Sequence, residues 1–177
     1  MAIVDPPYGI NLANNSFRQK HEKKDWDISI PNKDVFNELF RVSENQIIWG
    51  GNYFDLPPSQ GFVIWDKKQP ENFSSAMCEY AWSSFQRPAK IYSKWCVVNE
   101  NGKKIHPTEK PYNLYKWVLN NYAEEEQQIF DGYGGSMSLA IACWDLGFDL
   151  DICELDTDYF NDAVKRFENH IAQTQLF

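Results

Sequence analysis

The amino-acid sequence predicts a mostly parallel α/β sheet with helices on both of its faces. Short apolar runs typical of buried strands alternate along the chain with longer stretches whose apolar residues recur at helical spacing. This alternation is typical of parallel strands joined by crossover helices. The length of 177 residues and the hydrophobic content of 43% are enough for one globular domain with a sizeable core.

The first third of the chain supplies a strand, a loop and a helix. Ile3 and Val4 form a short strand, and the polar residues 11–31 are typical of a loop. Residues 32–43 predict a helix, because their apolar side chains recur at helical spacing and Asn32 can cap the first turn. Strands are then expected at the apolar runs 46–51 and 61–65 and at the alternating stretch 89–95.

The rest of the chain continues as helices and strands in alternation. Residues 110–122 predict a helix with apolar positions at 112, 114, 115, 118, 119 and 122, and Pro111 suits its first turn. The further elements expected are a strand at 128–130, a glycine-rich turn, a helix at 136–147, a strand at 148–154 and a helix at 157–171.

The net charge of −8 is unevenly distributed along the chain. Residues 111–177 carry 12 acidic and 3 basic side chains, whereas residues 61–110 carry 5 acidic and 8 basic ones. Basic side chains in the middle segment and in residues 18–24 could face phosphates or form an ordinary solvated surface, and charge alone leaves both options open. The candidates for DNA contact are Arg18, Lys20, Lys23, Lys24, Lys67, Lys68 and Arg87.

The sequence lacks the features of membrane, secreted and metal-binding proteins. No apolar run reaches the length of a membrane span, and no basic region followed by an apolar stretch begins the chain. The four cysteines form no C-x-x-C pair and the three histidines are scattered, so we expect reduced thiols and no metal. A cytoplasmic location is expected.

A stiff turn with unusual chemistry follows the first strand. Asp5 ends the strand, and Pro6 and Pro7 cannot continue a hydrogen-bonded ladder. A rigid loop after an edge strand explains the prolines. It does not explain why a carboxylate and the ring of Tyr8 flank them.

A second marked turn lies in residues 129–136. Its glycines allow a ligand to approach the backbone closely, and Ser136 stands near a helix N-terminus. Glu154 follows the next strand, where an acid is placed to bind ribose hydroxyls. An ordinary tight strand-to-helix connection is the alternative. The turn lacks basic residues, which favours a nucleoside with a small charged group over a pyrophosphate.

A third stretch, residues 105–111, reads IHPTEKP and precedes a helix. Thr108 offers a hydroxyl and Lys110 a cation, and together they could hold a carboxylate. A plain helix cap is the alternative for this stretch taken alone.

Taken together, DPPYG, HPTEKP and FDGYGGS resemble, in that order, the motifs of the permuted beta class of amino-group DNA methyltransferases. The likeness extends through VIWDK, EYAWSSF and ELDTDYF, so it covers nearly the whole chain. The chain is most similar to the small DNA adenine methylases of phages and prophages. The resemblance implies a single Rossmann-like methyltransferase domain over residues 1–177, in a bacterial or phage-infected cell, with S-adenosylmethionine as cofactor and double-stranded DNA as substrate.

The resemblance also implies a role for each residue of the first motif. Asp5 and the carbonyl of Pro6 would accept hydrogen bonds from the exocyclic amine of a flipped-out adenine, with Pro7 stiffening the turn. Tyr8 would stack on that base. The methyl group would pass directly to N6, with no covalent enzyme intermediate, so catalysis would rest on positioning and preorganised acceptors.

On the cofactor side, the resemblance assigns the glycine-rich loop to the methionine portion and Glu154 to the ribose. The H-P-T-x-K-P motif would lie near the cofactor's carboxylate. The cofactor-binding residues expected are His106, Thr108, Lys110, Asp131, Gly132, Gly134, Gly135, Ser136 and Glu154.

The sequence departs from the family pattern in two places. The pattern has a strand and a helix ahead of D-P-P-Y, whereas four residues precede Asp5, so either the enzyme is a minimal form or the natural start lies upstream. The glycine-rich loop ends in GYGGS rather than the commoner G-S-G-T. Target recognition is expected in a small insertion within about 66–104, with a contribution from residues 11–30.

Other functions share part of this pattern. Methylation of cytosine at N4 uses the same geometry, but family members acting on cytosine more often begin the motif with Ser, so Asp5 favours adenine. An RNA methyltransferase fits the motif order less well. A catalytically inactive DNA-binding module need not keep Asp5, Tyr8 and Glu154.

The last five residues, QTQLF, have two interpretations. They could be a frayed or folded-back tail. Alternatively, Q-x-x-L-F resembles the peptide that partners of bacterial sliding clamps insert into the clamp, with Leu176 and Phe177 as apolar anchors and Gln173 as the polar contact. A sliding clamp and a second copy of the chain in a homodimer therefore join DNA among the partners considered.

Overall fold

The computed structural model describes residues 1–14, 23–72, 76–95 and 104–174. Within these ranges one sheet contains seven strands: β1 (Ala2–Val4), β2 (Gln46–Trp49), β3 (Phe62–Asp66), β4 (Cys78–Ser83), β5 (Lys90–Ser93), β6 (Ile129–Asp131) and β7 (Leu150–Ile152). The helices are α1 (Lys33–Val42), α2 (Tyr112–Tyr122), α3 (Ser138–Leu146) and α4 (Thr157–Thr174), with short 3-10 turns at Leu12–Asn14 and Gly51–Tyr53.

The sheet is mostly parallel, which confirms the predicted fold class. Its strand order is β5-β3-β4-β2-β1-β6-β7, and only β4 runs antiparallel to its neighbours among the described strands. Helices cross over between β1 and β2, between β5 and β6, and between β6 and β7. β4 was not expected as a strand, because its sequence CEYAWS mixes a charge, a thiol and aromatic rings without a clear apolar run.

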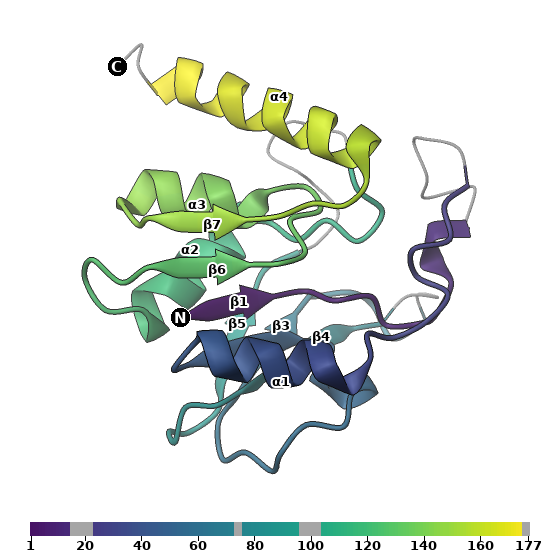
Figure 1. Cartoon of the computed structure of the whole chain (residues 1–177), viewed down its shortest axis with the longest axis vertical. Coiled ribbons are helices and arrows are strands. Elements are labelled where there is room, and N and C mark those ends of the chain that lie inside the picture. The colour runs from purple at the N-terminus through teal and green to yellow at the C-terminus, as the bar shows by residue number, and fades with distance from the viewer. Residues whose placement is uncertain (15–22, 73–75, 96–103, 175–177) are drawn as a thin grey trace.

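The two faces of the sheet are covered by different helices (Figure 1). On one face, α2 and α3 pack side by side over Ile3, Ile47 and Trp49. On the other face, α1 packs over Val4 and Ile48. Successive residues of a strand point to opposite faces, so the fully buried runs of β1 and β2 supply both cores.

Helix α1 begins where its sequence predicts. The side chain of Asn32 accepts a hydrogen bond from the N–H of Val35, which satisfies one of the free donors of the first turn. Phe36 and Leu39 are its buried side chains. No helix of the described residues combines the length and the apolar character that a membrane span needs.

The topology gathers the marked residues at one edge of the sheet. β1, β6 and β7 are parallel, so Asp5, Asp131 and Glu154 all lie at or just beyond the carboxyl ends of strands at the same edge. Because β4 runs in the opposite direction, its second residue, Glu79, reaches that edge as well. Lys67 follows the end of β3 there.

Some predictions fall outside the described residues. Arg18 and Lys20 lie in residues 15–22, and Leu176 and Phe177 lie beyond Thr174, so these predictions remain untested. Gln173 is exposed near the end of α4. In the predicted target-recognition segment 66–104, the structure describes β4 and β5 as strands of the central sheet.

Candidate active site

A pocket of about 550 Å³ opens at the carboxyl edge of β1, β6 and β7. All three motifs line it, and so do residues 24–27 and 154–156. The lining residues predicted from the sequence are Asp5, Pro6, Pro7, Tyr8, Lys24, His106, Thr108, Lys110, Asp131, Gly132, Gly134, Gly135, Ser136 and Glu154. Residues more than a hundred positions apart in the sequence therefore meet in one cavity of a size that suits a small-molecule ligand.

Asp5 is held by two donors from different motifs. Its Oδ1 accepts a hydrogen bond of 2.7 Å from the hydroxyl of Tyr8, and its Oδ2 lies 2.5 Å from the ammonium of Lys110. Burial raises the pKa of the Asp5 carboxyl, while the charge of Lys110 lowers it. Each carboxylate oxygen has two acceptor sites, so Asp5 keeps capacity for a further donor.

The ring of Tyr8 is fixed in place by its neighbours. It stacks on Tyr53 at a centroid distance of 4.8 Å and meets Phe54 edge-on. Gly50 permits this approach, because a Cβ there would lie 2.1 Å from the Tyr8 ring. Burial and the nearby Asp5 raise the pKa of the Tyr8 phenol well above its usual value, so the phenol stays neutral and donates to Asp5.

Asp27 anchors the backbone that follows the proline turn. Its Oδ1 accepts hydrogen bonds from the N–H groups of Tyr8 and Gly9, at 2.9 and 3.0 Å, and its Oδ2 accepts one from Leu12 at 2.8 Å. Asp27 is 2% exposed. This role could not be predicted from the sequence, because Asp27 lies in a polar stretch that is typical of an ordinary loop.

The ammonium of Lys110 points at the first motif. Besides Asp5, it lies 3.0 Å from a carboxylate oxygen of Glu79 and 3.3 Å from the Tyr8 hydroxyl. Here the ammonium of Lys110 pairs with Asp5 and Glu79 and donates to the Tyr8 hydroxyl. Lys110 also lines the pocket, and the contact with the cofactor's carboxylate that the family resemblance implies stays a prediction.

The glycine-rich loop is tied to Glu154. The N–H of Gly135 donates to Oε2 of Glu154 at 2.7 Å, and the N–H of Asp156 donates to Oε1 at 2.8 Å. Gly134 lies against the next strand, where a Cβ would be 3.1 Å from the carbonyl oxygen of Cys153. The loop and the acid are thus one unit, as their order in the sequence predicted.

Asp131 ends β6 as a buried carboxyl group at the base of the pocket. Its Oδ1 accepts a hydrogen bond of 2.9 Å from the N–H of Tyr133. Burial raises the pKa of Asp131 to about 7, with the negative charges of Asp5 and Glu154 acting in the same direction. Asp131 is therefore suited to receive a cationic group of a ligand.

His106 is a half-buried, neutral ring in the pocket wall. Burial lowers its pKa to about 3. The ring lies edge-on to Tyr159 at 4.4 Å and 5.1 Å from Trp26, and its Nδ1 is 3.0 Å from the Thr108 hydroxyl. His106 and Thr108 are thus part of an aromatic and polar wall.

Arg166 of α4 binds the end of the glycine-rich loop. It donates to the carbonyl oxygen of Ser136 at 2.7 Å and to the Ser138 hydroxyl at 2.9 Å, and it lies 3.3 Å from the buried carboxylate of Glu109. Neither Arg166 nor Glu109 was predicted as a site residue. A single Arg in a helix has no recognisable sequence pattern, and Glu109 stands at the variable position of its motif.

Most of the described basic candidates for DNA contact have acidic or aromatic partners within the chain. Lys24 pairs with Asp156 and Asp158, and Lys67 pairs with Glu79. The exposed Lys68 pairs with Asp66. Arg87 donates to the carbonyl oxygen of Asn121 and stacks on Phe85 and Tyr122. DNA contact by these side chains and by Lys23 stays a prediction.

Comparison with solved structures shows the same fold in DNA methyltransferases. The chain is similar to M1.HpyAVI in its complex with SAM, with a TM-score of 0.62 and 19% identity over 93% of this chain and 87% of that one. It is also similar to PvuII DNA methyltransferase, described as cytosine-N4-specific, with a TM-score of 0.58 and 12% identity over 97% and 83%. No family model and no curated protein sequence matches the chain.

Replacing Asp27 by Ala should destabilise the protein by about 2–4 kcal/mol. The change leaves three partly buried N–H groups without their acceptor, and each unsatisfied donor costs about 1–3 kcal/mol before relaxation. Asp27→Asn should cost less, because its amide oxygen can still accept. Urea unfolding measures the difference.

Asp25→Ala is the matched control, because this exposed acid is two residues away and, within the described part of the chain, accepts a hydrogen bond only through its backbone carbonyl. It should change the free energy of unfolding by less than about 0.5 kcal/mol. Equal stabilities for the two Ala variants would contradict the anchoring role of Asp27.

Proposed function

We propose that this protein is a DNA methyltransferase that transfers a methyl group from S-adenosylmethionine to the N6 amine of adenine. One observation carries the proposal: the Asp5–Tyr8 turn and the loop held by Glu154 open into the same pocket. The first offers hydrogen-bond acceptors for an amine, and the second has the form of a nucleoside site. The fold shared with DNA methyltransferases is consistent with this chemistry.

The pocket residues fit S-adenosylmethionine. When bound, S-adenosylmethionine supplies an electrophilic methyl group carried on a positively charged sulfonium. Glu154 would accept hydrogen bonds from the two ribose hydroxyls, because both of its oxygens retain acceptor sites beside their backbone donors. Asp131 would receive the ammonium of the methionine portion. The acidic lining suits a cationic ligand.

The Asp5 side of the pocket would hold the target base. Asp5 and the carbonyl of Pro6 would accept the two N–H groups of the amine, which leaves its lone pair free to attack. Tyr53 already covers one face of the Tyr8 ring, so a base would stack on the other. As the new N–C bond forms, the nitrogen must lose a proton, and the raised pKa of the Asp5 carboxyl makes it a fitting acceptor.

The preference for adenine rests on Asp5. N4-methylation of cytosine is the second candidate, because one similar structure is described as cytosine-N4-specific and both reactions place an exocyclic amine at the same acceptors. The protein is proposed to act on double-stranded DNA in the cytoplasm of a bacterial or phage-infected cell.

The reaction is tested by incubating the purified protein with tritiated S-adenosylmethionine and double-stranded DNA, digesting the DNA and identifying the labelled nucleoside. We expect N6-methyldeoxyadenosine. Label in N4-methyldeoxycytidine would transfer the proposal to the second candidate. No label in DNA of varied sequence would overturn it.

Asp5→Ala should abolish methyl transfer and leave cofactor affinity within a few-fold of wild type, because the ligand proposed for Asp5 is the base and not the cofactor. Asp34→Ala, on the exposed side of α1, serves as the control and should keep full activity. Turnover by Asp5→Ala within tenfold of wild type would place the reacting amine elsewhere.

Glu154→Gln should weaken cofactor binding by about 10- to 100-fold, because hydrogen bonds to a charged acceptor contribute about 1.5–3 kcal/mol. Calorimetry measures the dissociation constant. Asp149→Asn removes an exposed acid at the opposite end of β7 and should leave the constant unchanged. An unchanged constant in folded Glu154→Gln would remove this acid from the ligand site.

Cofactor affinity should rise as the pH increases from 6 to about 7.5. The pKa of Asp131 is about 7, so its carboxyl group is protonated at the lower pH and gains the charge that attracts an ammonium as the pH rises. Asp131→Asn should bind more weakly at pH 7.5 and lose this rise. A parallel pH dependence in both proteins would assign the effect to another group.

A further inference from the structure

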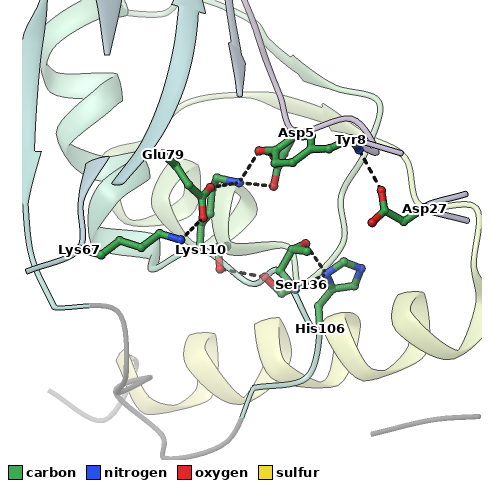
Figure 2. Close-up of polar contacts among 10 residues, drawn as sticks. Asp5, Tyr8, Asp27, Lys67, Glu79, His106, Lys110 and Ser136 are labelled. Atoms are coloured by element: carbon green, nitrogen blue, oxygen red, sulfur yellow. Dashed lines mark hydrogen bonds and ion pairs between the residues drawn. The ribbon is translucent and has the colours of Figure 1, made fainter. Parts of the chain in front are cut away.

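Glu79 lies behind the candidate active site, on the strand that the sequence did not predict. It pairs with Trp65 in the register of β3 and β4, and its side chain reaches the carboxyl edge of the sheet. Its Oε2 lies 3.0 Å from the ammonium of Lys110, and its Oε1 lies 2.5 Å from that of Lys67. Figure 2 shows Lys110 between Glu79 and Asp5, with Lys67 beyond Glu79.

Asp5, Lys110, Glu79 and Lys67 form a charge-balanced row, which we call the charged quartet. Carboxylates and ammonium groups alternate along it, so the net charge is zero. The side chain of Lys110 is 2% exposed, and those of Lys67, Asp5 and Glu79 are 13%, 15% and 21% exposed. Removing one member would leave an uncompensated charge in a poorly solvated place, which is costly in proteins.

Lys110 has three polar neighbours on this side of the pocket. It donates hydrogen bonds to Asp5 at 2.5 Å and to the Tyr8 hydroxyl at 3.3 Å, and it forms an ion pair with Glu79 at 3.0 Å. Without Glu79, the ammonium would turn fully toward Asp5. The carboxylate that should receive the target amine would then be occupied by a lysine.

We propose that Glu79 is a positioning residue for methyl transfer: by sharing Lys110 with Asp5, it fixes the orientation of the Asp5 carboxylate and keeps it available as an acceptor. This inference rests on the proposed function. Glu79 is not among the residues that line the cofactor pocket, so it acts on the reaction through Lys110.

The charge of Glu79 predicts the direction in which the pKa values of its neighbours should shift. Burial opposes the charge of Glu79, but Lys110 and Lys67 outweigh it and lower its pKa to about 2, so Glu79 is ionised at every working pH. Its negative charge raises the pKa of Asp5 and that of Lys110. Neutralising Glu79 should therefore move the titrations of both groups to lower pH.

Other charged or titratable groups near the quartet remain in place when Glu79 is changed. They come from the first motif, the loop before α2, α2, β6 and the loop after β7: Tyr8, His106, Tyr115, Asp131 and Glu154. A shift on neutralising Glu79 therefore reports the loss of its own charge.

The test is the pH–rate profile of Glu79→Gln under single-turnover conditions with saturating DNA. We expect the rate of methyl transfer to fall at least tenfold at its optimum, both limbs of the profile to move to lower pH, and the cofactor dissociation constant to stay within twofold. Glu38→Gln, which neutralises an exposed acid paired with Arg41 on α1, should change none of the three.

A charge-balanced double variant separates the positioning role of Glu79 from its contribution to the net charge of the quartet. In Glu79→Gln/Lys67→Gln, the net charge of the quartet stays zero, which protects the fold if the single variant is unstable. We expect the double variant to remain at least fivefold slower than wild type, because Lys110 still lacks its second carboxylate. A return to the wild-type rate would overturn positioning in favour of simple charge balance.

A readout without activity keeps this inference separate from the proposed function. The carboxyl carbon of Asp5, labelled with ¹³C and assigned by its loss in Asp5→Asn, can be titrated by NMR in wild type and Glu79→Gln. We expect the pKa of Asp5 to be lower in the folded variant. An unchanged pKa would overturn the inference even if methylation is observed, and a lowered pKa with no methylation by wild type would leave only the proposed function refuted.

Discussion

The contact between Asp5 and Lys110 joins two motifs that lie 105 positions apart in the sequence. It can form only if β1 ends beside the loop that precedes α2, and this requires the crossover order of the sheet. Because the contact is 2.5 Å long and Lys110 is almost fully buried, the two side chains fix each other. Tyr8 and Glu79 are then oriented around them, and the acceptor side of the pocket takes its shape from this arrangement.

The cofactor side of the pocket is held by contacts between side chains and the backbone. Glu154 and Arg166 bind the N–H and carbonyl groups of the glycine-rich loop. Asp27 does the same for the turn after Tyr8. Charged side chains therefore hold main-chain groups on both sides of the pocket in this structure. Preorganised acceptors are what direct methyl transfer requires.

The sequence was sufficient for the fold class, for the order of the helices and of the parallel strands, and for the three motifs lining one pocket. Parallel strands place their carboxyl ends at one edge, so Asp5, Asp131 and Glu154 could be expected together from strand order alone. β4 could not be predicted, because its six residues show no regular alternation. The roles of Asp27, Glu109 and Arg166 could not be predicted either. The role of a single charged residue depends on the groups that the fold places beside it.

The central claim is that one pocket holds the cofactor at Glu154 and presents its reactive end to Asp5. The most direct measurement is a crystal structure of the protein with S-adenosylhomocysteine, the product of the cofactor. The account predicts ribose hydroxyls within hydrogen-bond distance of Glu154 and a sulfur atom facing the Asp5–Tyr8 turn. A nucleoside bound outside this pocket, or with its sulfur directed away from Asp5, would contradict it.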